Sequence, residues 1–167
     1  MDLNDFSVSH VEGKSRVGLL KTSRGYVETP VFMPVGTSAT VKAMLPETLE
    51  AVGAQILLCN TYHLMIRPGE EVVNHLGGLN TFMNWSGPIL TDSGGFQVMS
   101  LAKLRQLDEN GVTFRSHVDG KKFLLTPEAS IKIQETLKST IIMAFDECTP
   151  FPVEKKIAEK SMKLSSR

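Results

Sequence analysis

The chain has 167 residues, of which 41% are hydrophobic and 22% are charged, and its formal net charge at pH 7 is zero. This composition excludes wholesale disorder, and the length suits one domain or part of a larger one. The balanced charge gives no support for a strongly basic nucleic-acid binder, although it leaves room for a local basic patch. No run of about 18 apolar residues is present, so we expect no membrane partner.

The cysteine content indicates a reducing compartment. Cys59 and Cys148 are too few and too far apart for a disulfide framework, so we expect a cytoplasmic protein. Neither cysteine belongs to a Cys-x-x-Cys pair, and we predict no metal site within the chain. The acidic first residues lack the apolar core of a signal peptide.

Residues 1–30 consist of short apolar and polar segments broken by glycines. Residues 17–22 and 25–29 have the pattern of two antiparallel strands, and Ser23-Arg24 between them suits a turn. We therefore predict a small antiparallel β segment at the start of the chain.

Residues 31–167 alternate between strand and helix patterns. Helix signals include Pro46-Glu47, with Gly53 as a stop, and the hydroxyl, proline and acid of Thr126-Pro127-Glu128, followed by an apolar face at spacing four. Asp119-Gly120 predicts a hairpin turn. The expected strands are 31–35, 55–59, 89–91, 112–118 and 141–145, and the expected helices are 46–53, 70–76, one from 126 onward and 153–167.

This alternation implies parallel strands joined by crossover helices. Four apolar runs are each followed at once by polar or small residues, at Gly36-Thr37-Ser38, Asn60 to His63, Asp92 to Gly95 and Asp146-Glu147-Cys148. In a parallel barrel or an open parallel sheet these ends share the carboxyl edge, where ligand sites are built. A (β/α)8 barrel needs about 250 residues, so roughly half of its strands would be present.

The stretch from Asp92 to Gln97 is the most informative candidate site. An acid follows a strand directly, two glycines let the backbone approach a ligand, Phe96 offers a face for stacking on a base, and Gln97 adds a donor and an acceptor. The alternative is structural, because Asp92 or Ser93 could simply cap a helix that begins near Phe96.

The run from Phe145 to Pro150 places two acids and a thiol at another strand end. A carboxylate at Asp146 can accept two hydrogen bonds from a guanine-like edge. Alternatively, the run is a solvated loop, Asp146 caps the helix near Val153, and Cys148 is a small buried hydrophobe. The polar run Asn60 to His63 suits ribose or phosphate groups, although a lone histidine such as His63 is more often structural than catalytic. The cationic tail beyond Val153 is more often a solvated helix face than a phosphate contact.

Several motifs in one order resemble the tRNA-guanine transglycosylases, also called queuine tRNA-ribosyltransferases, in their bacterial form. The resemblance runs from about Phe6 to the end of the chain and rests on these motifs: Thr29 to Thr37, Asn60 to Leu64 with Arg67-Pro68-Gly69, Asp92 to Ser100, Gly111 to Phe114 with Ser116-His117, and Phe145 to Pro150. Several long motifs in one order are far more specific than any single one.

The resemblance implies the fold and the reaction. The fold is α/β, the N-terminal portion of a (β/α)8 barrel preceded by the small antiparallel segment, with residues 1–167 forming part of a catalytic domain. The family exchanges guanine at the wobble position of certain tRNAs for preQ1, or 7-aminomethyl-7-deazaguanine, a queuosine precursor. An aspartate attacks the ribose anomeric carbon, which splits one hard displacement into two easier ones. The implied partners are tRNA and the free base, with a possible homodimer.

The resemblance also implies roles for individual residues. Asp92 resembles the acid that moves protons on the leaving and entering bases, Phe96 the aromatic that stacks on the base, and Asp146 the carboxylate that reads its edge. The remaining expected pocket members are Cys148, Ser93 and Gln97 beside the base, and Asn60 and Val35 near the ribose.

Two family features are expected beyond Arg167: the attacking aspartate and the cysteine-rich zinc subdomain. We therefore predict that the isolated chain is an inactive part of the enzyme. A non-catalytic binding or assembly module is the alternative, and the missing nucleophile favours it. A glycosidase that uses Asp92 and Asp146 as its acid pair is a third hypothesis, but the other motif residues leave it little room.

Overall fold

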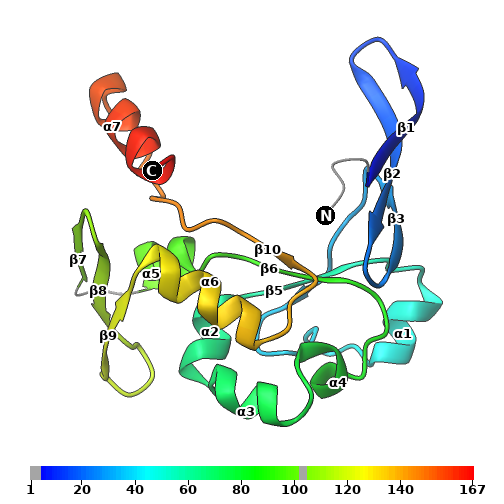
Figure 1. Ribbon diagram of the computed structural model, residues 1–167, viewed down its shortest axis with the longest axis horizontal. Coiled ribbons are helices and arrows are strands. Elements are labelled where there is room, and N and C mark those ends of the chain that lie inside the picture. Colours follow the sequence, from blue (N-terminus) through cyan, green and yellow to red (C-terminus); the bar gives the residue numbers. More distant parts are fainter. Residues whose placement is uncertain (1–4, 102–104) are drawn as a thin grey trace.

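A computed structural model describes residues 5–101 and 105–167 and has a parallel sheet at its centre (Figure 1). The strands lie in the order β10-β6-β5-β4, with bounds Ile141–Ile142, Ile89–Thr91, Leu57–Cys59 and Val35–Gly36. All three neighbouring pairs are parallel, which confirms the prediction from the strand–helix alternation. The four carboxyl ends therefore lie along one edge of the sheet.

Seven helices are present in the described residues, and most of them gather around one side of the sheet (Figure 1). Their bounds are α1 Pro46–Ala51, α2 Thr61–Ile66, α3 Glu70–His75, α4 Leu79–Met83, α5 Gly95–Leu101, α6 Pro127–Thr136 and α7 Lys155–Ser165. Helix α7 stands apart from the others, at the C-terminal end of the chain. No helix in the described part of the chain is long and apolar enough to cross a membrane.

Two antiparallel sheets flank this centre. The first, of β1 Phe6–Glu12, β2 Ser15–Thr22 and β3 Gly25–Thr29, projects as an arm (Figure 1). The predicted pair is β2 and β3, and β1 was missed because all of its side chains are exposed, which leaves no buried face to recognise. The second sheet contains β7 Arg105–Asp108, β8 Gly111–Arg115 and β9 Lys122–Leu125. The predicted hairpin turn lies between β8 and β9.

The core is one apolar cluster between the sheet and the helices. Leu57, Cys59 and Ile89 contribute from the strands, and Tyr62 and Leu64 contribute from α2, each at most 1% exposed. Leu137, at the end of α6, is also fully buried, as its place on the predicted apolar face requires. Burial of these side chains fixes the spacing between the sheet and the helices that precede and follow each strand end.

Two predicted strands are much shorter than expected. The expected strand 31–35 is reduced to Val35–Gly36, with Phe32 80% exposed, and prolines at positions 30 and 34 explain this because they have no N–H to pair. The expected strand 141–145 is reduced to Ile141–Ile142. There the side chain of Gln134 forms hydrogen bonds with both the N–H and the carbonyl oxygen of Met143, so the backbone pairing with β6 stops at Ile142.

The helix predictions have mixed outcomes. Helix α6 begins where predicted, and Thr126 Oγ1 accepts a hydrogen bond of 3.1 Å from the Ala129 N–H. Helices α1, α3 and α7 are confirmed within a few residues. Helices α2 and α4 were missed, since both are short and neither has a side-chain cap. The polar run from Asn60 to His63 is thus the start of α2 rather than a loop.

Candidate functional site

Asp92 lies at the carboxyl end of β6 and is held by the neighbouring strand end. Asn60, which follows β5, donates from Nδ2 to Asp92 Oδ2 at 2.5 Å, and the Thr61 N–H donates to Asp92 Oδ1 at 3.0 Å. The Thr61 hydroxyl also donates to the Asp92 carbonyl oxygen at 2.5 Å. The parallel pairing of β5 and β6 therefore aligns Asn60 with Asp92, two of the predicted site residues.

The same carboxylate holds the turn into α5. The Gly94 N–H donates to Asp92 Oδ1 at 3.1 Å, which is a capping contact of the kind left open by the sequence. Asp92 is nevertheless only half-buried, so its carboxylate retains access to the edge of the sheet. Capping and proton transfer are compatible roles for one carboxylate.

The two glycines after Ser93 are required by the backbone. Gly94 has φ +84°, a conformation that favours glycine. At Gly95 an added Cβ would lie 2.6 Å from the Asp146 carbonyl oxygen. This absence of a side chain lets the β6 loop come directly against the segment that follows β10.

Ser93 connects these two strand ends. Its hydroxyl donates to Asp146 Oδ1 at 3.1 Å and accepts from the Gly95 N–H at 3.2 Å. Ser93 is buried at 5% exposure, whereas Asp146 is exposed and its second oxygen is open to a ligand. The link brings the predicted recognition acid beside the predicted acid/base loop.

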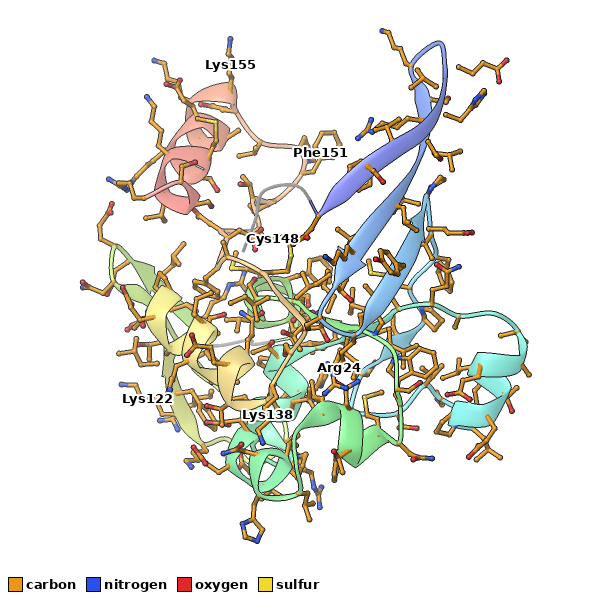
Figure 2. All side chains as sticks on the ribbon, turned by 45° about the vertical axis from the view of Figure 1, so that its right-hand side comes forward. Arg24, Lys122, Lys138, Cys148, Phe151 and Lys155 are labelled. Atoms are coloured by element: carbon orange, nitrogen blue, oxygen red, sulfur yellow. The ribbon has the colours of Figure 1, made fainter. Side chains whose placement is uncertain are left out.

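The other predicted residues lie around this edge. Phe96, at the start of α5, is 61% exposed, and Gln97 beside it has a buried Oε1 that accepts no hydrogen bond within the described part of the chain. Val35 pairs with Leu58 at the end of β4. Figure 2 shows Cys148 on the segment that leads from β10 to α7, where it is half-buried. Val35 thus lies within the outer strand β4 and Cys148 follows the outer strand β10, while the other six residues follow the two inner strands or contact their ends.

An aromatic cluster lies behind Asp92. The Tyr62 hydroxyl is 2.9 Å from His117 Nδ1, and the rings of His63 and His117 meet edge to face at 5.9 Å. Burial and the nearby His117 lower the pKa of His63, while Asp92 opposes that shift. Burial, followed by the charge of Asp92, raises the pKa of Cys59 to about 12, so that thiol is not a nucleophile at neutral pH.

Sequence reasoning missed two buried polar residues of α6. Ser130 and Gln134 are both 0% exposed, and Ser130 Oγ donates to the Ser93 carbonyl oxygen at 2.7 Å. The available signal was their spacing of four, which places them on one helix face next to the predicted apolar stripe. A polar pair beside an apolar stripe indicates a buried hydrogen-bonded contact.

A cavity of about 520 Å³ lies beside the edge rather than over Asp92. Its walls come from α5, the β7–β8 hairpin, the start of α6 and the end of α7, and only Gly95 and Asp146 belong to the candidate site. Across residues 5–101 and 105–167, no three histidine, cysteine, aspartate or glutamate side chains gather closely enough to hold a metal ion.

Comparison with known proteins gives the same family as the motifs. Residues 11–167 match the sequence profile of the family described as queuine tRNA-ribosyltransferase. Proteins of that name from a Jannaschia species and a Ruegeria species are 60% and 58% identical to the chain over 164 and 166 residues. One from Rickettsia bellii is 59% identical over 162 residues. These matches cover 97–99% of the chain but only 44–45% of each relative, so the chain spans less than half the length of the curated relatives it matches.

Proposed function

Because this chain belongs to the queuine tRNA-ribosyltransferase family, we propose that it forms the base-recognition and proton-transfer part of an enzyme that replaces guanine in tRNA with preQ1. The observation that carries the proposal is the hydrogen bond from Ser93 to Asp146, which joins the acid/base loop to the recognition acid. Two of the motifs that carry the resemblance, Asp92 to Ser100 and Phe145 to Pro150, thereby meet at one edge of the sheet.

Each residue has a role that its surroundings support. Asp146, exposed beyond its bond to Ser93, accepts hydrogen bonds from the N–H and amino groups of the base. Phe96 stacks on the base, which its exposure permits. Asn60 holds Asp92 and, with Val35, borders the ribose, while Ser93 and Gln97 belong to the base pocket. Cys148 lies beside the base.

The reaction needs a carboxylate nucleophile that we place in the remainder of the enzyme, beyond Arg167. That carboxylate forms a bond to the ribose anomeric carbon as the bond to guanine N9 breaks, and Asp92 protonates the departing base. In the second half, Asp92 takes the N9 proton of preQ1, which then displaces the carboxylate. Zinc belongs, in this proposal, to the same remainder, and no step here passes through it.

The exposed edges of the central sheet support a larger barrel. In the described part of the chain β4 and β10 each pair with one neighbouring strand, so their outer edges are unpaired, and Val35 and Ile142 on these strands are exposed. We propose that further strands pair with these edges in a (β/α)8 barrel, and that the isolated chain is inactive. Both cysteines are free thiols, which supports a cytoplasmic setting.

A direct test is incorporation of labelled guanine into tRNA. The test protein, called the extended protein below, is residues 1–167 continued by the C-terminal part of the Jannaschia relative, which is 60% identical over the shared region. Label should enter tRNA in the presence of the extended protein, which is the parent of the variants below, and not in the presence of the same protein after heat denaturation. Absence of incorporation by a folded extended protein would refute the proposal, and release of sugar from a simple glycoside would favour the glycosidase alternative.

A further inference from the structure

We propose that Gln134, a buried residue of α6, is a positioning residue that fixes the ends of β6 and β10 relative to each other. It touches neither the base nor the ribose in the proposed function. It acts through Thr91, Met143 and Ser130, which lie next to the residues that do. The inference rests on the proposed function for what these strand ends do, but its geometry stands independently.

The side-chain amide of Gln134 uses its full hydrogen-bonding capacity. Its Oε1 accepts from the Thr91 hydroxyl and from the Met143 N–H, both at 2.9 Å. Its Nε2 donates to the Met143 carbonyl oxygen at 2.9 Å and to Ser130 Oγ at 3.2 Å. An amide has two acceptor sites and two N–H donors, so all four are satisfied.

These partners also fix the orientation of the amide. Met143 presents a donor and an acceptor to the same side chain, as a neighbouring strand would. Turning the amide over would place the two N–H groups together and the two oxygens together. Gln134 therefore replaces one step of the β ladder at the point where β10 ends, and it does so at 0% exposure. Buried polar groups that lose such partners are costly, so the arrangement is well determined.

The contacts close a ring that passes through the candidate site. From Met143 the ring runs to Gln134, on to Ser130, from the Ser130 hydroxyl to the Ser93 carbonyl oxygen, and from the Ser93 hydroxyl to Asp146, three residues after Met143. The second arm from Gln134 reaches Thr91, the residue before Asp92. The Gln134 amide thus fixes the positions of Asp92 and Asp146 relative to each other at the sheet edge.

Loss of the Gln134 contacts should mainly affect recognition of the free base. Displacement of the β10 end moves Asp146 relative to Ser93 and Phe96, and a shift of about 1 Å in a reacting geometry is costly. We expect the rest of the tRNA to make its contacts away from this ring. Loss of Gln134 should therefore raise the KM for guanine more than the KM for tRNA.

The test uses Gln134→Met in the extended protein, because methionine has a similar length and lacks the four hydrogen bonds. Glu135→Gln is the matched control, as Glu135 is exposed on the same helix and only approaches Lys132, at 3.7 Å. We expect Gln134→Met to raise the KM for guanine about tenfold, with the KM for tRNA within about twofold of the parent, and Glu135→Gln to match the parent. Equal changes in both KM values, or none, would overturn the positioning role.

A second measurement separates this inference from the proposed function. Hydrogen exchange followed by mass spectrometry should show faster exchange in Gln134→Met for peptides that cover 89–95 and 141–146, and unchanged exchange in the β1–β3 arm. If Gln134→Met loosens these peptides but the extended protein without this substitution incorporates no guanine, the proposed function alone is refuted. Unchanged or uniformly faster exchange would refute the role of Gln134, whatever the activity. If Gln134→Met fails to fold, Ser130→Ala removes the hydroxyl that donates to the Ser93 carbonyl oxygen and accepts from Gln134 Nε2, while the other three hydrogen bonds of Gln134 remain. Ser130→Ala should therefore loosen peptide 89–95 more than peptide 141–146.

Discussion

The hydroxyl of Ser93 donates to Asp146 Oδ1 at 3.1 Å, across 53 positions of sequence. Ser93 belongs to the loop after β6 and Asp146 to the segment after β10, and these two strands are neighbours in the sheet. The contact therefore connects Asp146 to the residue that follows Asp92, and the sequence predicted different roles for these two acids. Substitutions at the two acids should therefore have different effects.

Asp92→Asn in the extended protein should lower base exchange by about 10²-fold or more, because an amide cannot transfer the proton at neutral pH. The asparagine Oδ1 can still accept from Thr61 and Gly94, and the Asn60 amide can turn over so that its Oδ1 accepts from the new Nδ2, so the fold should be retained. Glu71→Gln, an exposed change on α3, is the control. Exchange at the parent rate in Asp92→Asn would leave Asp92 with its capping role only.

Asp146→Ala should weaken binding of guanine or preQ1. A hydrogen bond to a charged partner contributes about 1.5–3 kcal/mol, which corresponds to roughly 10- to 150-fold in affinity at about 1.4 kcal/mol per decade. Isothermal titration calorimetry on the extended protein measures this directly, with circular dichroism as the check on folding. Unchanged affinity in a folded variant would remove Asp146 from the recognition site.

The two thiols should differ in reactivity. Cys59 is fully buried with its pKa raised to about 12, whereas Cys148 is half-buried. Iodoacetamide at pH 8 should therefore modify Cys148 and spare Cys59 in the native extended protein, as read from the two peptides by mass spectrometry. In guanidinium both should react. Equal labelling of the native protein would contradict the burial of Cys59.

The free energy of unfolding should fall as the pH is lowered below 6.5, the ordinary pKa of histidine, and protonation of His63 should contribute to this fall. Burial and the nearby His117 lower its pKa below 6.5, so the unfolded state binds more protons just below that pH. The contribution of neutral His63 is present above pH 6.5 and is lost as the pH falls through the folded-state pKa. His63→Gln should flatten the change in Tm between pH 7.5 and pH 5.5, while His75→Gln, at an exposed site, should not. Identical pH profiles for His63→Gln and the parent would argue against this role.

The sequence predicted the elements with strong local signals. Thr126 and Pro127 start α6 where expected, and the apolar runs that became β5 and β6 are buried on one face, with Leu58 and Leu90 half-buried on the other. Because these strands are parallel, their ends meet, and the proximity of Asn60 to Asp92 followed from topology alone. The family motifs had already singled out both residues.

The rest depended on tertiary contacts that local patterns do not carry. Residues 31–33 are apolar but are flanked by Pro30 and Pro34, and β10 stops where Gln134 replaces the ladder. Helix α2 begins without a side-chain cap because the Asn60 amide donates to Asp92 instead. The ring through Ser130 and Gln134 could be suspected from their spacing, but its partners are 9 to 43 positions away.

The division of the active site between this chain and the remainder of the enzyme is the central claim. Its most direct test is labelled guanine incorporation into tRNA by purified residues 1–167 and by the extended protein, side by side under the same conditions. We expect incorporation by the extended protein and none by residues 1–167, because we propose that the attacking carboxylate lies beyond Arg167. Normal turnover by residues 1–167 alone, as a folded monomer, would contradict both the half-barrel and the placement of the nucleophile.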